Sequence, residues 1–229
     1  ARIRALETSL FTSQIIDQLL ACDTEEQCIQ ILQEKGWGDN DTGSAEAILE
    51  RETEKIWETM KDLGVDMSVF DVLSYPNLFH NLKAAIKDAC SGVDNQNLNI
   101  YYEDTQISPK EMLEIIKNKE FSRFPENMAG AAREAYETLL HTGDGQLCDV
   151  IIDRAALDAI YAAGEAAKDS IIKEYAESVV AIADIKIAVR SQKTAKTIEF
   201  MKRAMAPCKS INVDQLAKAA TAGMEAVTE

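Results

Sequence analysis

The sequence predicts an all-α, multihelical protein. Its 229 residues include only 10 Gly and 4 Pro, so few positions interrupt a helix. β-Branched residues do not gather in runs of strand length, and apolar residues recur at spacings of three and four along most of the chain. Because 46% of the residues are hydrophobic and 28% are charged, we expect a globular fold with a sizeable core rather than disorder.

The first third of the chain carries two helical segments. Residues 1–35 are predicted to be helical because their apolar residues recur at helical spacing. A Gly-Trp-Gly turn at 36–38 ends this segment. A polar loop at 39–44 leads into the second segment, residues 45–63, which ends at Gly64.

Further helical segments fill the rest of the chain. They are residues 77–90, 109–119, 127–141 and 153–205, the last of them broken near Gly164, and a final helix from about residue 212. Between the first two, Leu98, Ile100 and Tyr102 form either a short strand or an ordered loop. Glycines flanking Asp144 predict a tight turn between helices.

Three short helices are predicted to begin with the same capping pattern. A residue able to cap a helix N-terminus is followed three positions later by Gln or Glu, which is the capping-box spacing. The three caps are Thr24 with Gln27, Ser108 with Glu111, and Asn212 with Gln215.

A similar helical signature lies upstream of each cap. It places a polar, an aliphatic, a basic and a small or aliphatic residue in that order, starting at Arg2, Asn81 and Asp184. Capping boxes alone are common in helical proteins, but the shared order of signature and cap predicts quasi-threefold repeated helical subdomains. The expected subdomains are residues 1–76, 77–182 and 183–229, the third being incomplete.

The charge balance restricts the partners. With 39 acidic and 24 basic residues the net charge is -15, which disfavours binding to nucleic acid or directly to anionic lipid. No apolar run approaches the roughly 20 residues that span a bilayer, and no signal peptide opens the chain. Five scattered Cys without C-x-x-C spacing are typical of reduced thiols. We therefore expect a cytosolic protein.

No motif predicts a catalytic, cofactor or metal site. The phosphate-binding and dinucleotide-binding glycine motifs are missing from the sequence. His80 and His141 do not form a zinc motif, so structural or surface roles are favoured. The segment from Asp39 to Glu50 resembles a Ca²⁺ loop, but Ser44 stands where the sharp turn needs Gly, so a solvated loop before a helix is predicted.

Six basic residues stand at matching places in the repeated helices. They are Arg2, Arg4, Lys83, Lys87, Lys186 and Arg190. One interpretation is that they pair with nearby carboxylates. The other is that they face one central surface and meet a partner's acidic end or the carbonyl groups at a helix C-terminus. The second interpretation makes them the candidate partner interface.

Several segments, taken in order, resemble one known family. They are residues 1–7 (ARIRALE), 32–38 (LQEKGWG), 80–83 (HNLK), 149–154 (DVIIDR) and 183–186 (ADIK). The set is similar to the C-type stalk component of bacterial and archaeal V-type ATP synthases, which is equivalent to the d-type component of eukaryotic vacuolar ATPases. Family members carry three complete helical subdomains arranged like a funnel, so the resemblance implies a C-terminally truncated chain.

The resemblance implies a non-catalytic central-stalk adapter. Such an adapter links the rotating shaft to the membrane rotor ring and transmits torque for proton or sodium transport coupled to ATP hydrolysis or synthesis. Its partners would be shaft and ring subunits, at the cytoplasmic face of the membrane, with no cofactor. From the residues alone, a helical-repeat scaffold for soluble protein partners remains the alternative, and an enzyme with a carboxylate site is less favoured.

Overall fold

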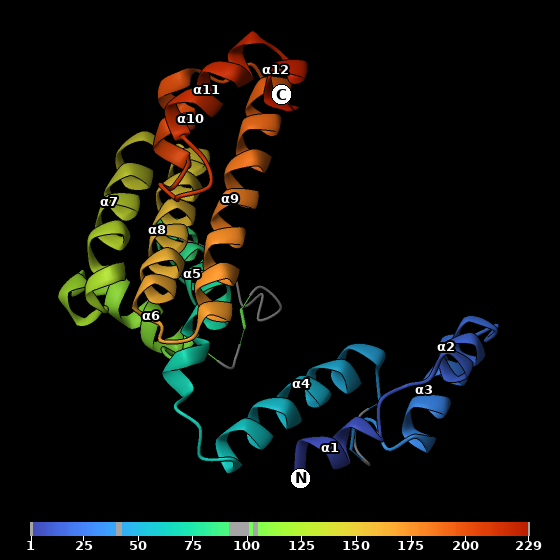
Figure 1. The fold of residues 1–229 in the computed structure, drawn as a ribbon. Coiled ribbons are helices and arrows are strands. Elements are labelled where there is room, and N and C mark those ends of the chain that lie inside the picture. Colours follow the sequence, from blue (N-terminus) through green and yellow to red (C-terminus); the bar gives the residue numbers. More distant parts are fainter. Residues whose placement is uncertain (1, 40–42, 92–100, 103–104, 229) are drawn as a thin grey trace. The chain divides into compact units, whose positions relative to one another are not determined.

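The structure, a computed structural model, describes residues 2–39, 43–91, 101–102 and 105–228. Within these ranges the chain forms helices and no strand (Figure 1), which confirms the all-α prediction. The alternatives for Leu98 and Ile100, and part of the loop after Asp39, lie outside the described residues. The chain divides into two compact units, Ala1–Met67 and Ser68–Glu229, and the division into three subdomains stays a prediction.

The N-terminal unit begins with three short helices across the segment predicted to be helical over residues 1–35, and the last of them starts after the predicted cap Thr24. Its helices are α1 (Arg2–Glu7), α2 (Ser13–Leu20), α3 (Glu25–Glu34) and α4 (Ala45–Asp62), followed by the 3-10 helix η1 (Met67–Phe70). The Thr8 and Ser9 hydroxyls donate to the carbonyls of Ala5 and Leu6 at 2.6 and 2.7 Å. These side chains bind the last turn of α1 and favour a helix end there, so the segment predicted upstream of Thr24 is two helices rather than one long helix.

A glycine turn connects α3 to the loop before α4. Gly36 has φ +82°, a left-handed conformation that glycine favours, and α3 ends there as predicted. The Trp37 ring then stacks on the Phe11 ring with centroids 4.4 Å apart. The Gly38 N–H donates to the Glu52 carboxylate at 2.9 Å, which holds the turn against α4.

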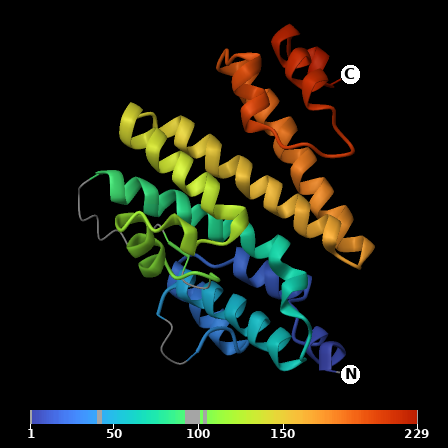
Figure 2. The same ribbon diagram turned by 90° about the vertical axis from the view of Figure 1, so that its left-hand side faces the viewer.

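The C-terminal unit contains the larger helices. They are α5 (Asp71–Ser91), α6 (Pro109–Lys117), η3 (Phe121–Arg123), α7 (Glu126–Thr142), α8 (Gly145–Ala166), α9 (Ser170–Lys193), α10 (Ile198–Ala204), α11 (Val213–Ala222) and α12 (Met224–Thr228). Helix α8 packs against α5, α7 and α9 (Figures 1 and 2). One hydrophobic core is formed by the helices from α5 through α8, and a second is formed by the helices from α9 through α12.

Two predicted features in the middle of the chain can be compared with the structure. Helix α5 begins before the predicted residue 77 and contains Pro76. Val72 and Leu78 on either side are buried, and we attribute the extension to this packing, which offsets the hydrogen bond that proline removes. The tight turn is confirmed, because Gly143 has φ +68° and Asp144 caps α8.

The helix predicted over residues 153–205 is three helices with different boundaries. Helix α8 begins earlier and continues through Gly164, so the break predicted near that glycine is misplaced. The chain instead breaks at 167–169, where the Asp169 side chain accepts the Ile171 N–H at 2.8 Å and caps α9. Gly164 allows α8 and α9 to pack closely, because a Cβ atom there would lie 2.2 Å from the Ala176 Cβ atom of α9.

The three predicted caps are confirmed. The side chains of Thr24, Ser108 and Asn212 accept the backbone N–H three residues on, at 3.4, 3.3 and 3.0 Å. Each capped helix is also followed by a residue with positive φ. These residues are Gly36 (+82°), Lys119 (+58°) and Gly223 (+143°). Helix α4 has the same features, a Ser44 cap and Gly64 at φ +67°, so this pattern is shared by four helices and the repeat stays a prediction.

A buried polar residue on a long helix holds a distant loop at two places in the C-terminal unit. On α5, Asn81 accepts the Tyr102 N–H at 2.8 Å and donates to the Tyr102 carbonyl at 2.7 Å. On α9, Asp184 accepts the Ala206 N–H at 3.0 Å. Both side chains are fully buried, and both open the signature identified in the sequence. We call these two contacts the loop clamps.

Candidate partner-binding site

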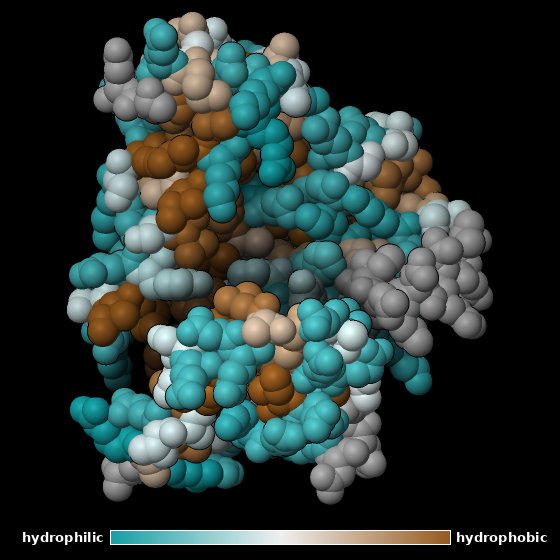
Figure 3. Space-filling model, turned by 90° about the vertical axis from the view of Figure 1, so that its right-hand side faces the viewer, coloured by the Kyte–Doolittle hydropathy of each residue, from teal (hydrophilic) through white to brown (hydrophobic). Residues whose placement is uncertain are grey.

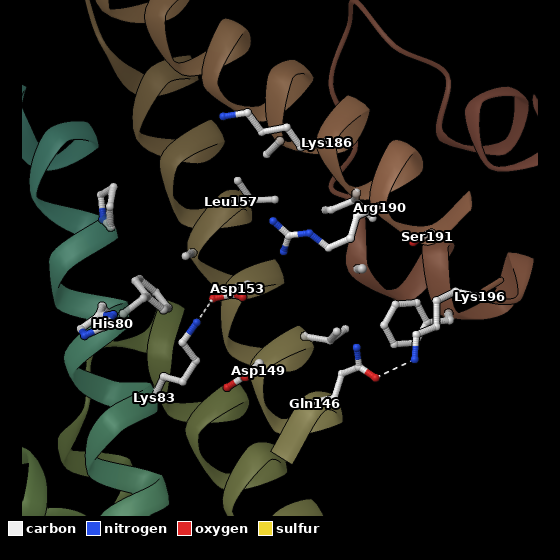
Figure 4. Close-up of a pocket in the computed structure, with 18 of the residues that line it drawn as sticks. His80, Lys83, Gln146, Asp149, Asp153, Leu157, Lys186, Arg190, Ser191 and Lys196 are labelled. Carbon is white, nitrogen blue, oxygen red and sulfur yellow. Dashed lines mark hydrogen bonds and ion pairs between the residues drawn. The ribbon is translucent and has the colours of Figure 1, made fainter. Parts of the chain in front are cut away.

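A pocket of about 680 Å³ opens between α5, α8, α9 and the start of α10 (Figure 4). Its wall mixes apolar side chains with charged ones. The charged or titratable residues are His80, Lys83, Asp149, Asp153, Lys186, Arg190 and Lys196. A chain of net charge -15 thus gathers more basic than acidic groups around one hollow, which favours an anionic or carbonyl-rich ligand.

On one side of the pocket the cations are neutralised. Lys83 pairs with Asp153 at 2.7 Å, and Lys87, one turn along α5, pairs with Asp149 at 2.6 Å. The two lysines and the two aspartates are each four residues apart, so both pairs form along facing stripes of antiparallel α5 and α8. These cations connect two helices and leave little charge for a partner.

On the other side the cations are not neutralised. Lys186 and Arg190 stand at the equivalent positions of α9, and neither has an ion pair or a hydrogen-bonded side chain within the described ranges. Figure 4 shows the side chains of Arg190 and Lys186 both extending from α9 toward α8. These two residues are therefore the part of the predicted interface that is available to a ligand.

An exposed hydrophobic band runs along α9 beside these cations. It consists of Ile171, Tyr175, Ile182 and Ile185, which are 42% to 72% exposed. Their spacing of three, four and seven residues places them on one face of the helix. Figure 3 shows hydrophobic side chains gathered in a column at the upper left. We call these four residues the α9 band; exposed apolar patches of this kind mark interaction surfaces.

The remaining candidate residues lie in the N-terminal unit and are paired. Arg2 contacts Asp62 at 3.0 Å, and Arg4 contacts Glu7 at 2.9 Å. All four side chains are largely exposed, so these pairs contribute little to stability. Of the six predicted interface residues, the structure thus places Lys83, Lys186 and Arg190 around one pocket with Lys87 close by.

Comparison with protein families gives a match along the entire chain. Residues 1–229 match the family model described as ATP synthase (C/AC39) subunit. The chain belongs to this family. Neither a curated protein nor a solved structure matches the C/AC39 chain significantly. The family expected from the ordered sequence segments is thereby confirmed.

Metal-binding clusters and membrane-spanning helices are both missing from the described part of the C/AC39 chain. Within those ranges, no group of three or more His, Cys, Asp or Glu side chains is arranged to hold a metal ion. In the same part of the chain, no helix combines the length and hydrophobicity needed to cross a bilayer.

Some pocket residues of this C/AC39 chain were not predicted from the sequence. Lys196 lies after α9, donates to the Gln146 carboxamide at 2.7 Å and sits 5.0 Å from the Phe200 ring centroid. Asp149 and Asp153 had a usable signal, because their spacing of four matches that of the lysines on α5. Lys196 had no such signal in the sequence, because only the turn at the end of α9 brings it to the pocket.

The loop clamp on α9 predicts a pH effect on the stability of this C/AC39 chain. Burial raises the pKa of Asp184 from 3.8 to about 6; the Ala206 N–H and Arg154 oppose this rise, and Asp158 adds to it. Because the folded state binds the proton more tightly, stability should fall as pH rises from about 4 to 6 and then level off. Asp184→Asn should remove a loss of about 3 kcal/mol.

Chemical denaturation of both proteins between pH 4 and 7 measures this effect. The variant keeps an oxygen for the Ala206 N–H, so its advantage over the wild type should grow through the window. A constant difference between the two curves would contradict the assignment to Asp184.

Proposed function

We propose that this C/AC39 chain is a non-catalytic central-stalk adapter of a V-type rotary ATPase. It links the rotating shaft to the membrane rotor ring at the cytoplasmic face of the membrane. It transmits torque that couples proton or sodium transport to ATP hydrolysis or synthesis. The chain performs no covalent chemistry in this role, so its physical requirements are stiffness and complementary surfaces.

One observation carries the assignment of a binding surface. Helix α9 holds two cations without described side-chain partners next to an exposed hydrophobic band, whereas the equivalent cations of α5 are paired. A shaft segment with apolar side chains and an acidic or carbonyl-rich end is complementary to this surface. We place the shaft at Lys186, Arg190 and the α9 band, and the ring on another face.

The packing of the C-terminal unit suits the transmission of force. Helix α8 contacts four other helices, α5, α7, α9 and α10, and buried side chains fill the spaces between them. Close-packed interiors have low compressibility and transmit strain. The loop clamps add hydrogen bonds from long helices to loops, which limits independent movement of those loops.

Charge reversal of the two α9 cations should weaken binding to the shaft. With Lys186→Glu and Arg190→Glu combined, we expect the dissociation constant for recombinant shaft subunits to rise about tenfold or more, because attraction becomes repulsion at the contact. Titration calorimetry or co-elution at micromolar concentration measures the change.

Lys193→Glu is the control, and it is compared with Lys186→Glu and Arg190→Glu taken singly, because each of these reverses one charge. This lysine lies on the same helix, is exposed and does not line the pocket, so its reversal should alter binding far less. Equal weakening by the control would assign the effect to net charge rather than to this surface. No binding of the wild-type chain to the shaft subunits would contradict the proposed function itself.

A further inference from the structure

Two cysteine thiols converge at the corner between α2 and α3. The Cys22 thiol donates to the Gln18 carbonyl at 3.3 Å, and the Cys28 thiol donates to the Leu19 carbonyl at 3.6 Å. The two acceptors are consecutive carbonyls at the end of α2. The Cys28 side chain also lies close enough to Cys22 to raise the pKa of its thiol, so the two sulfur atoms are neighbours.

Solvent can reach this pair. Both Cys22 and Cys28 are partly exposed, and both belong to the N-terminal unit, so their proximity does not depend on how the two units are arranged. They flank Thr24, the residue that caps α3 through the Gln27 N–H. The corner between them is short and held in place by this cap, which keeps the thiols close together.

A second cysteine pair in the chain provides an internal comparison. Cys148 is fully buried in the core of the C-terminal unit, and Cys90 packs against the same core. Burial raises the pKa of Cys148 to about 11. Cys90 is partly exposed, but Cys148 is both inaccessible and protonated and should react slowly with disulfides, so no bond should form between these two cysteines under conditions that oxidise exposed thiols.

We infer that Cys22 and Cys28 form a reversible intramolecular disulfide by exchange with a small-molecule disulfide. The Cys28 thiolate attacks one sulfur of the reagent and releases the first reagent thiolate, leaving a mixed disulfide at Cys28. The Cys22 thiolate then attacks the Cys28 sulfur and releases the second. Two protein thiols are oxidised, one reagent disulfide is reduced to two thiols, and the two protons lost by the cysteines pass to the released thiolates.

The order of attack follows from the local electrostatics. Burial, then the hydrogen bond and charge of the Cys28 sulfur, raise the pKa of Cys22. Cys22 therefore holds its proton more tightly than a free thiol does, and we assign it the second step, in which it resolves the mixed disulfide. Disulfides between accessible thiols are the readily reduced, regulatory kind, so the bond should open again when reductant is restored.

The test uses the reduced full chain incubated with oxidised glutathione. We expect the wild type to lose two titratable thiols and the mass of two hydrogen atoms, with peptide mapping placing the bond between Cys22 and Cys28. Cys22→Ser should instead retain glutathione at Cys28, because the resolving thiol is gone. Dithiothreitol should restore both thiols in the wild type.

Cys90→Ser and Cys148→Ser are the controls, and each should behave like the wild type. A bond between Cys90 and Cys148, stable glutathione adducts on both cysteines of the wild type, or full retention of its thiols would each overturn the inference. Circular dichroism of each variant before oxidation shows whether it is folded, and Cys28→Ala offers a second removal of the pair should a serine variant fail to fold.

Discussion

Gly164→Ala should lower the free energy of unfolding by about 2 kcal/mol or more, despite the higher helix propensity of alanine. The added Cβ atom would lie 2.2 Å from the Ala176 Cβ atom, so α8 and α9 must move apart. Both helices form the pocket wall, and their separation also disturbs the buried contact of Ile160 with Ala176. Urea denaturation followed by circular dichroism measures the change.

The same substitution elsewhere gives a control of opposite sign. Gly130 lies inside α7, and an added Cβ atom there meets no atom within 4 Å. Gly130→Ala should therefore stabilise the chain by about 0.5–1 kcal/mol. Ala176→Gly should rescue part of the loss in the Gly164→Ala background, because it removes the atom that clashes. Additive effects of the two substitutions would contradict the close helix crossing.

Asn81→Asp should lower the free energy of unfolding by about 2–4 kcal/mol at neutral pH. The amide of Asn81 donates to the Tyr102 carbonyl and to the Thr105 hydroxyl, at 2.7 and 3.1 Å. A carboxylate cannot donate, so it leaves the carbonyl without its partner and places a charge at a fully buried position. Thermal or urea denaturation at pH 7 measures the loss.

The reciprocal substitution, Asp184→Asn on α9, tests whether the effect of Asn81→Asp comes from the residue type rather than from any change at a buried clamp. Asp184→Asn introduces the same residue that the α5 clamp uses, and the Ala206 N–H keeps its acceptor. Its stability at pH 7 should therefore exceed that of the wild type. If Asn81→Asp and Asp184→Asn destabilise the chain equally, the loss in Asn81→Asp cannot be assigned to the donor that the Tyr102 carbonyl requires.

Features set by a few neighbouring residues could be predicted from the sequence. The caps at Thr24, Ser108 and Asn212 depend on one side chain and an N–H three residues on, so local spacing is sufficient. The same holds for the turn at Gly143, whose positive φ suits glycine. The signature that starts at Asn81 and at Asp184 indicated that these two residues occupy equivalent positions. It did not predict that each side chain would hold a distant loop.

Features set by distant packing could not be predicted. Gly164 resembles a helix breaker in the sequence, yet it lies inside α8 because α9 passes too close for a side chain. The same limit applies to the candidate interface. Lys83 and Lys186 occupy equivalent places in the repeat, but only the former faces an aspartate on α8. Sequence spacing identifies the stripe on each helix and not the residue opposite it.

The central claim is that this C/AC39 chain transmits torque without performing chemistry. Reconstituting the rotary ATPase in vesicles with and without the native full-length protein tests it, with ATP hydrolysis and ion transport measured in the same preparation. We expect omission to abolish ATP-driven ion transport while the soluble head continues to hydrolyse ATP, and we expect addition of the protein to restore transport. Ion transport that persists at the same rate without it would contradict the claim.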